Sequence, residues 1–578
     1  EHLLSYLADD FVRELELSGR LDTLRDFSQR QIDYFHALPP QLKSPESTRN
    51  AALALVHHAR ALRSLGRPGE ALKDVKEALG LLEGLRRAGD DSEATTTALA
   101  LANLAQFQVL DNMGDQKAFD SATRALALIT PVAEAPGASR ATREAYVDVL
   151  TRTAFGYWYQ QKYPEAAKTG IQARAAAAAM GALDLSDPDM TAWYLEATGW
   201  TVGALAFTGR VAEGRRYADE AYELGTRLLR RRPGNRLALH AMGILGTTLS
   251  AFALEDLDPR RAAELGERND ALLHTLLDLD PENVVALNNL GDTDSNTGQA
   301  FFAAGDFRRA LDYLSRAPGS GERAAAREGN VGFLLNSVTF MGNLGATQAQ
   351  LGDAPGFAQT LERIRAAGAR LAKAVPAGSA RAVLTESGID ALQALHQLLQ
   401  GNTQESRRLG SAAQSLLEHA RVEGEADRQI QESLLGILGG NLAVASLGLG
   451  DDAAAEAQAR SALRHRQVSE PPGLVGSRRD FNEVTAWLAI AQARQGRLAQ
   501  ARATLAPALK FQRDLLARNR SDVWVPFELA RQLYAQAFTE PGRRAALLKE
   551  AAAQLGKSPP QVRATPYFAW LQRLIARG

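Results

Sequence analysis

The sequence predicts an all-α protein made of stacked antiparallel helix pairs, and three observations predict it. A turn motif of the form Gly-x-x-x-x-small recurs along the chain, as in residues 66–71 and 305–310. The nine successive intervals between the turn markers Gly66 and Gly496 are 46 to 49 residues long, a period typical of solenoids. The segments between turns are rich in Ala, Leu, Arg, Glu and Gln, which favour helices, and show almost none of the β-branched alternation typical of strands.

Each unit is expected to contain two helices joined by a short turn. In the second unit, for example, helices are expected over residues 50–65 and 68–86. Polar or proline-bearing loops are expected between units, at residues 38–46, 130–139, 183–188, 231–235, 280–282, 318–322, 374–379 and 469–477. The first residues of the turns are Gly19, Gly66, Gly114, Gln161, Gly209, Leu257, Gly305, Gly352, Gly401, Gly450, Gly496 and Glu540.

Small residues recur at two fixed places around these turns. Eight of ten residues that stand seven positions before the markers from Gly66 to Gly496 are small, and so are eight of ten that stand five positions after them. Small side chains at these places let two helices cross closely. The local sequences Leu344-Gly345, 162–166 (KYPEA), 280–283 (DPEN) and 286–291 (ALNNLG) follow the same scheme. In these features the chain resembles the tetratricopeptide repeat, with longer helices than the standard unit of about 34 residues.

The resemblance implies a right-handed superhelical solenoid of about 12 antiparallel helix pairs with a period of about 48 residues. We expect one continuous array over residues 1–578, with a capping helix in residues 560–578. Armadillo and HEAT repeats also fit the period. They do not supply the paired small residues, the glycine turn and the aromatic residue that follows it.

Composition excludes several classes of function. The net charge is −1, so no overall field attracts nucleic acid or anionic lipid, and neither is expected as a partner. The chain contains no cysteine, which excludes disulfides and thiolate chemistry. Its opening lacks the pattern of a signal peptide, and no uninterrupted apolar run reaches the length of a spanning helix. Because residue 1 is Glu, we expect a soluble, cytoplasmic fragment of a longer protein.

Motifs of catalysis and metal binding are absent from the sequence. It has no phosphate-binding loop, no zinc-binding helix motif and no nucleophile elbow. Residues 292–298 superficially resemble a calcium loop, but the glycine and the twelfth ligand are misplaced and the segment is expected to be helical. No catalytic residue, cofactor or metal ligand is therefore predicted, and the chain is not expected to be an enzyme.

The resemblance implies that the first helix of each pair lines a concave groove. Nine residues before the turn markers, a place where peptide-clamping repeats carry Asn, three of ten residues are Asn. Bridging of neighbouring helices is the alternative role for these amides, and core packing is the alternative for the aromatic residues. The residues expected to bind a partner are Arg152, Trp158, Tyr159, Trp200, Asn289, Asn296, Asn336, Asn343, Asn441 and Trp487.

The function expected from this pattern is a non-catalytic interaction or sensor module. Its partner would be a peptide, a folded protein or a second copy of the chain. The long helices resemble the C-terminal arrays that follow effector domains in bacterial signalling and defence proteins, which implies regulation of an upstream effector that is absent from this chain. The alternative is a free-standing scaffold or chaperone adaptor for complex assembly.

Overall fold

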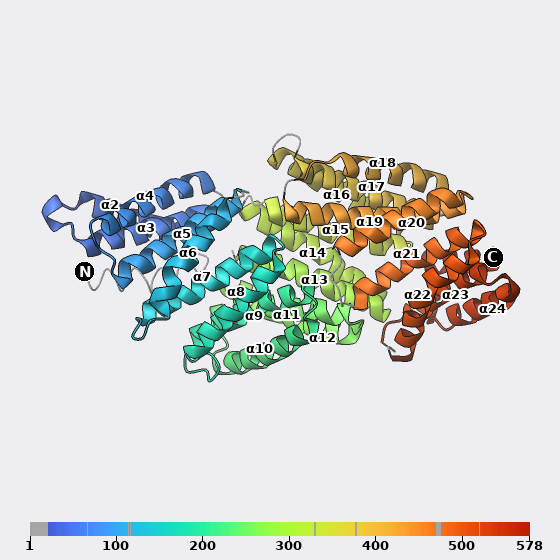
Figure 1. Ribbon diagram of the computed structural model, residues 1–578, viewed down its shortest axis with the longest axis horizontal. Coiled ribbons are helices and arrows are strands. Elements are labelled where there is room, and N and C mark those ends of the chain that lie inside the picture. Colours follow the sequence, from blue (N-terminus) through green and yellow to red (C-terminus); the bar gives the residue numbers. More distant parts are fainter. Residues whose placement is uncertain are drawn as a thin grey trace. The chain divides into compact units, whose positions relative to one another are not determined.

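The computed structural model describes residues 21–65, 67–113, 115, 117–281, 283–328, 331–375, 379–422, 424–469, 475–518 and 521–577. Helices follow one another through these ranges, which contain no strand (Figure 1). The predicted all-α fold class is confirmed. The sequence also predicts a helix at residues 3–17, and this segment and the marker Gly19 lie outside the described residues.

Successive α-helices form antiparallel pairs, whose first members we call A helices and whose second members we call B helices. The A helices are α3 (Pro45–Ser64), α5 (Glu93–Asn112), α7 (Arg140–Tyr159), α9 (Pro188–Phe207), α11 (Arg236–Glu255), α13 (Val284–Ala304), α15 (Val331–Leu351), α17 (Ala380–Leu399), α19 (Glu425–Gly448), α21 (Val475–Arg494) and α23 (Val525–Thr539). The B helices are α4 (Pro68–Arg87), α6 (Ala118–Ala133), α8 (Tyr163–Ala179), α10 (Val211–Arg231), α12 (Pro259–Leu279), α14 (Phe307–Glu328), α16 (Ala354–Ala374), α18 (Thr403–His419), α20 (Asp452–Ser469), α22 (Leu498–Arg518) and α24 (Arg544–Leu555). Helix α2 (Leu21–Ala37) precedes the first of these pairs, and α25 (Pro560–Arg563) and α26 (Pro566–Arg577) follow the last. Short 3₁₀ helices lie at Pro40–Leu42 (η1) and Pro541–Arg543 (η2).

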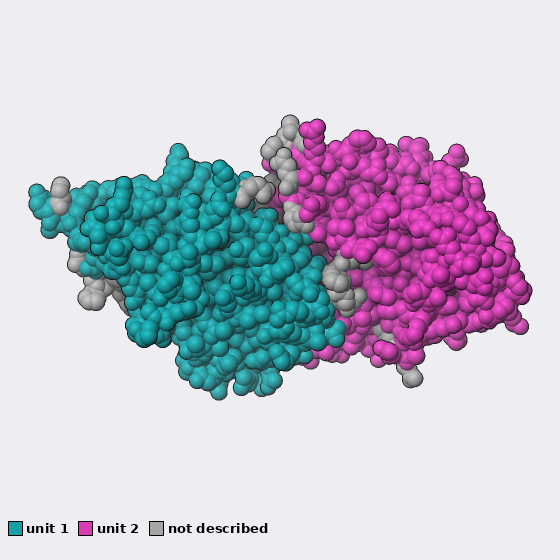
Figure 2. Space-filling view, viewed as in Figure 1, with its two compact units in different colours: residues 1–248, 271–287, 323–330 teal, residues 249–270, 288–322, 331–578 magenta. Residues whose placement is uncertain are grey.

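The chain forms two compact units (Figure 2). Unit 1 comprises residues 1–248, 271–287 and 323–330, and unit 2 comprises residues 249–270, 288–322 and 331–578. The continuity of one array over residues 1–578 stays a prediction.

Within each unit the A helices of successive pairs pack against one another. In unit 1, α3 contacts α5, α5 contacts α7 and α7 contacts α9, and in unit 2 the same succession links α15, α17, α19, α21 and α23. Each of these A helices also packs against its own B helix. This layering of helix pairs confirms the tetratricopeptide-like arrangement that the sequence predicts.

The turns between A and B helices share one backbone conformation. All eight described markers from Gln161 to Gly496 are left-handed, with φ of 58° at Gln161, 57° at Leu257 and 78° to 88° at the six glycines. Glycine adopts this region without strain, whereas other residues rarely do. The turn recurs even where Gln161 and Leu257 replace glycine, so the repeat geometry imposes it. Gly66 and Gly114 lie outside the described residues.

The small residues around the turns bring the two helices of a pair into contact. The Ser250 hydroxyl donates to the carbonyl oxygen of Ala262 at 3.0 Å, and the Ser406 hydroxyl donates to that of Ala394 at 2.8 Å. A Cβ placed on Gly298 would lie 3.0 Å from the carbonyl oxygen of Ala310. In each case the two residues are the paired small positions, 12 apart, and a larger side chain would force the helices apart.

The expected loop at residues 318–322 is wrong, because α14 continues through Pro318 to Glu328. Ala317 and Ala324, on either side, are fully buried, and a Cβ on Gly321 would lie 3.1 Å from the Cβ of Ser337 in α15. Close packing against α15 therefore outweighs the cost of a proline inside the helix. The local Pro-Gly-Ser-Gly composition could not reveal this tertiary contact.

The last helix of unit 2 is largely buried along one side. Phe568, Trp570, Leu571 and Ile575 of α26 are each at most 9% exposed and join a core cluster with residues of α21 and α23. Helix α26 contacts α24 and α23, and also α15 and α17, which lie much earlier in the chain.

Candidate functional site

A chain of alternating charges crosses the A helices of unit 1. Arg60 of α3 pairs with Asp148 of α7 at 3.2 Å, Asp148 pairs with Arg152 one turn later at 3.4 Å, and Arg152 reaches Glu196 of α9 at 3.0 Å. The Arg152 side chain is 34% exposed, whereas that of Glu196 is 5% exposed. We call these four residues the unit 1 ladder. Such alternation offers both donors and acceptors to a polar partner.

Aromatic rings lie beside the ladder. The Arg152 guanidinium stands 5.2 Å from the ring centroid of Trp193, and the ring of Trp200 lies 4.7 Å from that of Phe155 and 5.6 Å from that of Trp158. The indole N–H groups of Trp158 and Trp200 are buried and have no hydrogen-bond partner among the described residues. Arg152, Trp158 and Trp200, which the sequence predicts to bind a partner, thus lie on neighbouring helices α7 and α9. The side chain of Tyr159 lies outside the described residues.

Two histidines of the A helices are held neutral. Burial, aided by the charge of Arg60, lowers the pKa of His57 to about 3. Burial also lowers the pKa of His240, which Glu196 partly opposes. Both imidazoles are therefore uncharged near pH 7. Within the described ranges, no cluster of metal-ligating side chains is present.

In unit 2, asparagines connect α13 with α15. Asn336 donates to the side-chain oxygen of Asn288 at 3.0 Å, and Asn343 donates to the Ser295 hydroxyl at 3.1 Å. Both pairs are 48 residues apart, so the bonds repeat with the period of the array. The bridging of neighbouring helices that the sequence left open is thus present at Asn336 and Asn343. Each bond uses one amide hydrogen, and both asparagines are partly exposed.

Two carboxyl groups of α13 lie in this polar region. Burial raises the pKa of Asp292 to about 7, although Asn288 donates to its carboxylate at 3.1 Å. Burial also raises the pKa of Asp294 to about 7, against the attraction of Arg316, which pairs with it. The charge of this region therefore changes near neutral pH.

The other predicted asparagines are dispersed. Asn289 and Asn296 lie on α13 and are partly exposed, and Asn441 lies on α19. The Asn289 amide nitrogen is buried without a partner among the described residues. Arg152, Trp158 and Trp200 thus lie on α7 and α9 in unit 1, whereas Asn289, Asn296, Asn336 and Asn343 lie on α13 and α15 in unit 2.

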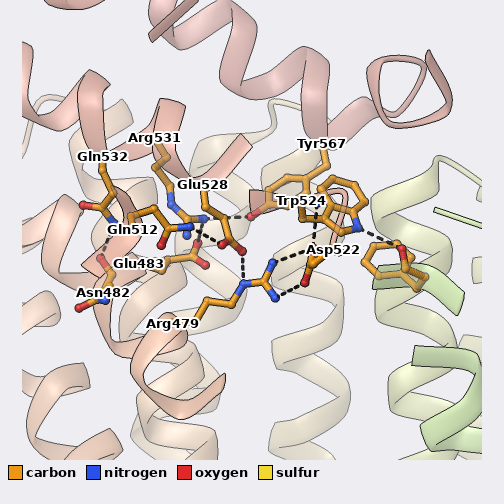
Figure 3. Close-up of polar contacts among 11 residues, drawn as sticks. Arg479, Asn482, Glu483, Gln512, Asp522, Trp524, Glu528, Arg531, Gln532 and Tyr567 are labelled. Carbon is orange, nitrogen blue, oxygen red and sulfur yellow. Dashed lines mark hydrogen bonds and ion pairs between the residues drawn. The ribbon is translucent and has the colours of Figure 1, made fainter. Parts of the chain in front are cut away.

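Trp487, the last predicted residue, is 2% exposed and meets Trp570 of α26 edge to face at 5.8 Å. Helices α21 and α23 also carry a largely buried ionic cluster that the sequence did not reveal (Figure 3). Arg479 of α21 binds Asp522 at 2.7 Å and also Glu528 of α23, while Arg531 binds Glu483 at 2.9 Å. The one indication in the sequence was that oppositely charged residues, among them Arg479 and Glu528, lie on the successive A helices α21 and α23.

Burial and neighbouring charges both shift the pKa values of groups in this cluster. Burial alone would lower the pKa of Arg479, but Asp522 and Glu528 outweigh it and raise that pKa. Burial raises the pKa of Tyr567, whose hydroxyl accepts a hydrogen bond from Arg531 at 3.3 Å. Burial also raises the pKa of the Glu528 carboxyl group, and the charge of Arg479 opposes this shift.

The surface of the described residues also carries open hollows. One, of about 440 Å³, is lined in unit 1 by Tyr146 and the alanine run of α8, and another, of about 960 Å³, lies between α14 and the helices α15 and α16. Among the described residues, two helices, Arg236–Glu255 and Asp427–Gly448, have the length and composition of membrane spans, but 67% and 61% of their apolar windows are buried inside the protein.

Comparison with known proteins gives similarity in structure alone. No family model matches the chain, and no curated protein does. A Rap protein complexed with competence and sporulation factor is similar over 73% of this chain and 99% of its own, with 13% identity and a TM-score of 0.43. Human IFIT1 dimers are similar too. The dimer with m7Gppp-AAAA has 13% sequence identity and a TM-score of 0.34, and the match covers 92% of this chain and 94% of that one. The dimer with PPP-AAAA has 14% sequence identity and a TM-score of 0.33, and the match covers 93% of this chain and 95% of that one. At these scores the likeness says nothing of function.

Proposed function

We propose that the chain is a non-catalytic interaction module that binds a peptide or protein partner on the A helices. The observation that carries this proposal is the unit 1 ladder, in which charged side chains from α3, α7 and α9 form one connected, partly exposed row. If this face had a purely structural role, apolar side chains would give a more stable fold, because burying a charge pair costs desolvation energy.

The ladder is suited to a polar, extended ligand. Its charges alternate in sign, so a peptide backbone can donate to Asp148 and Glu196 and accept from Arg60 and Arg152. The adjacent rings of Trp193 and Trp200 supply apolar contact area, and Trp and Arg residues carry much of the binding energy in protein interfaces. In unit 2, the asparagine bridges between α13 and α15 offer a second polar row.

The finer proposal is that binding regulates an effector domain in a cytoplasmic signalling or defence protein. A free-standing scaffold or chaperone adaptor is the second candidate. The coding sequence upstream of Glu1 separates them, since an in-frame effector domain favours the sensor.

The test is a selection of random displayed peptides on the full chain. The affinity of the recovered peptides is then measured by fluorescence anisotropy for three variants, Arg152→Ala, Asn296→Ala/Asn343→Ala and the control Gln359→Ala, whose exposed amide lies on B helix α16. We expect at least one of the first two variants to weaken binding about tenfold, which is the loss of one or two hydrogen bonds. Unchanged affinity in both variants, with helicity intact, contradicts the proposal.

A further inference from the structure

The C-terminal part of unit 2 lies against the ends of much earlier A helices. The Trp524 indole donates to the carbonyl oxygen of Phe302 at 3.1 Å, and the Val523 backbone N–H donates to that of Ala303 at 2.9 Å. Tyr567, in the first turn of α26, packs against a cluster that contains Phe357, Leu392 and Leu399. The last helix therefore spans from the end of the array back to α15 and α17.

Helix α26 covers the A-helix position where the sequence predicts a partner. Trp487 stands nine residues before the marker Gly496, and its ring meets Trp570. Arg531, on the neighbouring A helix α23, donates to the Tyr567 hydroxyl (Figure 3). The surface beneath α26 is thus formed by the side of α21 and α23 that corresponds to the predicted groove.

This surface is more polar than the support of a permanent cap requires. Trp487 Nε1 and Arg531 Nε, on the two residues that meet α26, are buried without a hydrogen-bond partner in the described part of the chain, and both residues are 2% exposed. Elsewhere on α21 and α23, three more buried atoms lack a partner among the described residues: Asn482 Nδ2, Gln532 Oε1 and Gln536 Oε1. Each such atom destabilises the folded state, because it has lost its hydrogen bonds to water and gained none in the protein. A surface adapted only to α26 would be expected to replace them with apolar groups.

Helix α26 has the chemistry of a groove ligand. Phe568, Trp570, Leu571 and Ile575 are buried on one side, whereas Gln572, Arg573 and Arg577 are exposed. It is only 12 residues long and is joined to α25 by two residues. Amphipathic helices that place apolar anchors in a groove are a common mode of peptide recognition. A helix this short is marginal in isolation, so its stability comes from the surface on which it lies.

We propose that α26 is a built-in ligand of the A-helix surface formed by α21, α23, α15 and α17, and that an amphipathic helix with the same aromatic anchors competes with it. The phenol hydrogen-bonded to Arg531 and the indole against Trp487 define the anchors that such a partner carries. This inference deepens the proposed function, because it names the kind of partner that one A-helix surface takes and gives that surface an intramolecular competitor.

The probe is a fluorescent synthetic peptide of residues 559–577, titrated against the full chain and measured by anisotropy. Tyr567→Ala/Trp570→Ala in the protein weakens its own α26 and is expected to bind the peptide at least tenfold more tightly than the unmodified chain does. A peptide with the same two substitutions is expected to bind at least tenfold more weakly to that variant. Arg573→Ala, at an exposed position of α26, is the matched control and should behave like the unmodified chain.

If the double variant keeps its helicity and cooperative melting but does not bind the peptide, α26 is a fixed cap and the inference is overturned. If the double variant does not fold, hydrogen exchange of the unmodified chain decides. Amides of α26 should then exchange at least tenfold faster than those of α23 under native conditions, and equal protection overturns the inference. If the α26 peptide does not bind but the selected peptides still bind the unit 1 ladder, this inference is overturned and the proposed function is not.

Discussion

Trp524 and Phe302 are joined by a hydrogen bond and by ring stacking although they lie 222 positions apart. The indole N–H donates to the Phe302 carbonyl oxygen at 3.1 Å, and the two ring centroids are 5.0 Å apart. The Trp524 side chain is 5% exposed. This contact fastens the loop before α23 to the end of α13, so the C-terminal pairs of unit 2 are held by more than their sequence neighbours.

Removing the indole N–H should loosen this attachment. Trp524→Phe keeps an aromatic ring but removes the indole donor, so that the Phe302 carbonyl oxygen accepts only from the Gly305 N–H. We therefore expect the free energy of unfolding of unit 2 to fall by about 1 kcal/mol. Trp524→Ala should cost about 3 to 5 kcal/mol, because it also leaves a cavity. Urea unfolding followed by circular dichroism measures both. An unchanged free energy of unfolding in Trp524→Phe would show that the hydrogen bond contributes nothing.

Because the turn is left-handed at every described marker from Gln161 to Gly496, we expect substitutions at two of these markers to change stability in opposite directions. Gly450 has φ of 78° and open space around its Cβ position, so Gly450→Ala should destabilise the protein by about 1 to 2 kcal/mol through backbone strain alone. Gln161 has φ of 58° at the same place in its repeat, so Gln161→Gly should stabilise by about 1 kcal/mol. Thermal unfolding of both variants is the measurement. A loss of stability in Gln161→Gly would mean that its side chain contributes more than its backbone strain costs.

Asp292 should make stability depend on pH. Its pKa is raised from 3.8 in the unfolded chain to about 7 in the folded one, so the folded state binds the proton more tightly. Stability from this group is therefore fully present below about pH 4 and is lost as the pH rises to about 7. Asp292→Asn stays neutral and can still accept from Asn288. We expect the variant to melt at a higher temperature than the unmodified chain at pH 8 and at a similar temperature at pH 4. A temperature difference that does not change with pH would refute the assignment.

The fold could be predicted from the sequence because the residues that define the repeat act locally. Glycine turns and small crossing residues act within one helix pair, so their period predicts the pairs, including the turns at Gln161 and Leu257 where glycine is missing. The loop expected at Pro318 was wrong because Gly321 packs against Ser337, a contact with no local signature.

The candidate site could be predicted from the sequence only in part. A position nine residues before a turn identifies the A helix and its side, and Arg152, Trp200 and Asn343 do lie on α7, α9 and α15. What each side chain meets depends on the next helix. Asn343 turned out to bridge to Ser295, and Trp487 turned out to be covered by α26. The ionic cluster around Arg479 joins residues up to 49 positions apart, which no local pattern links.

Photo-crosslinking of a bound peptide tests the central claim most directly. A selected peptide that carries a benzophenone is crosslinked to the full chain, and the attachment sites are read by mass spectrometry after digestion. We predict attachment within the A helices, foremost α7 and α9 beside Arg152 and Trp200, or α13 and α15 beside Asn296 and Asn343. Attachment confined to B helices such as α8 and α16 would contradict the claim that the A helices bind the partner.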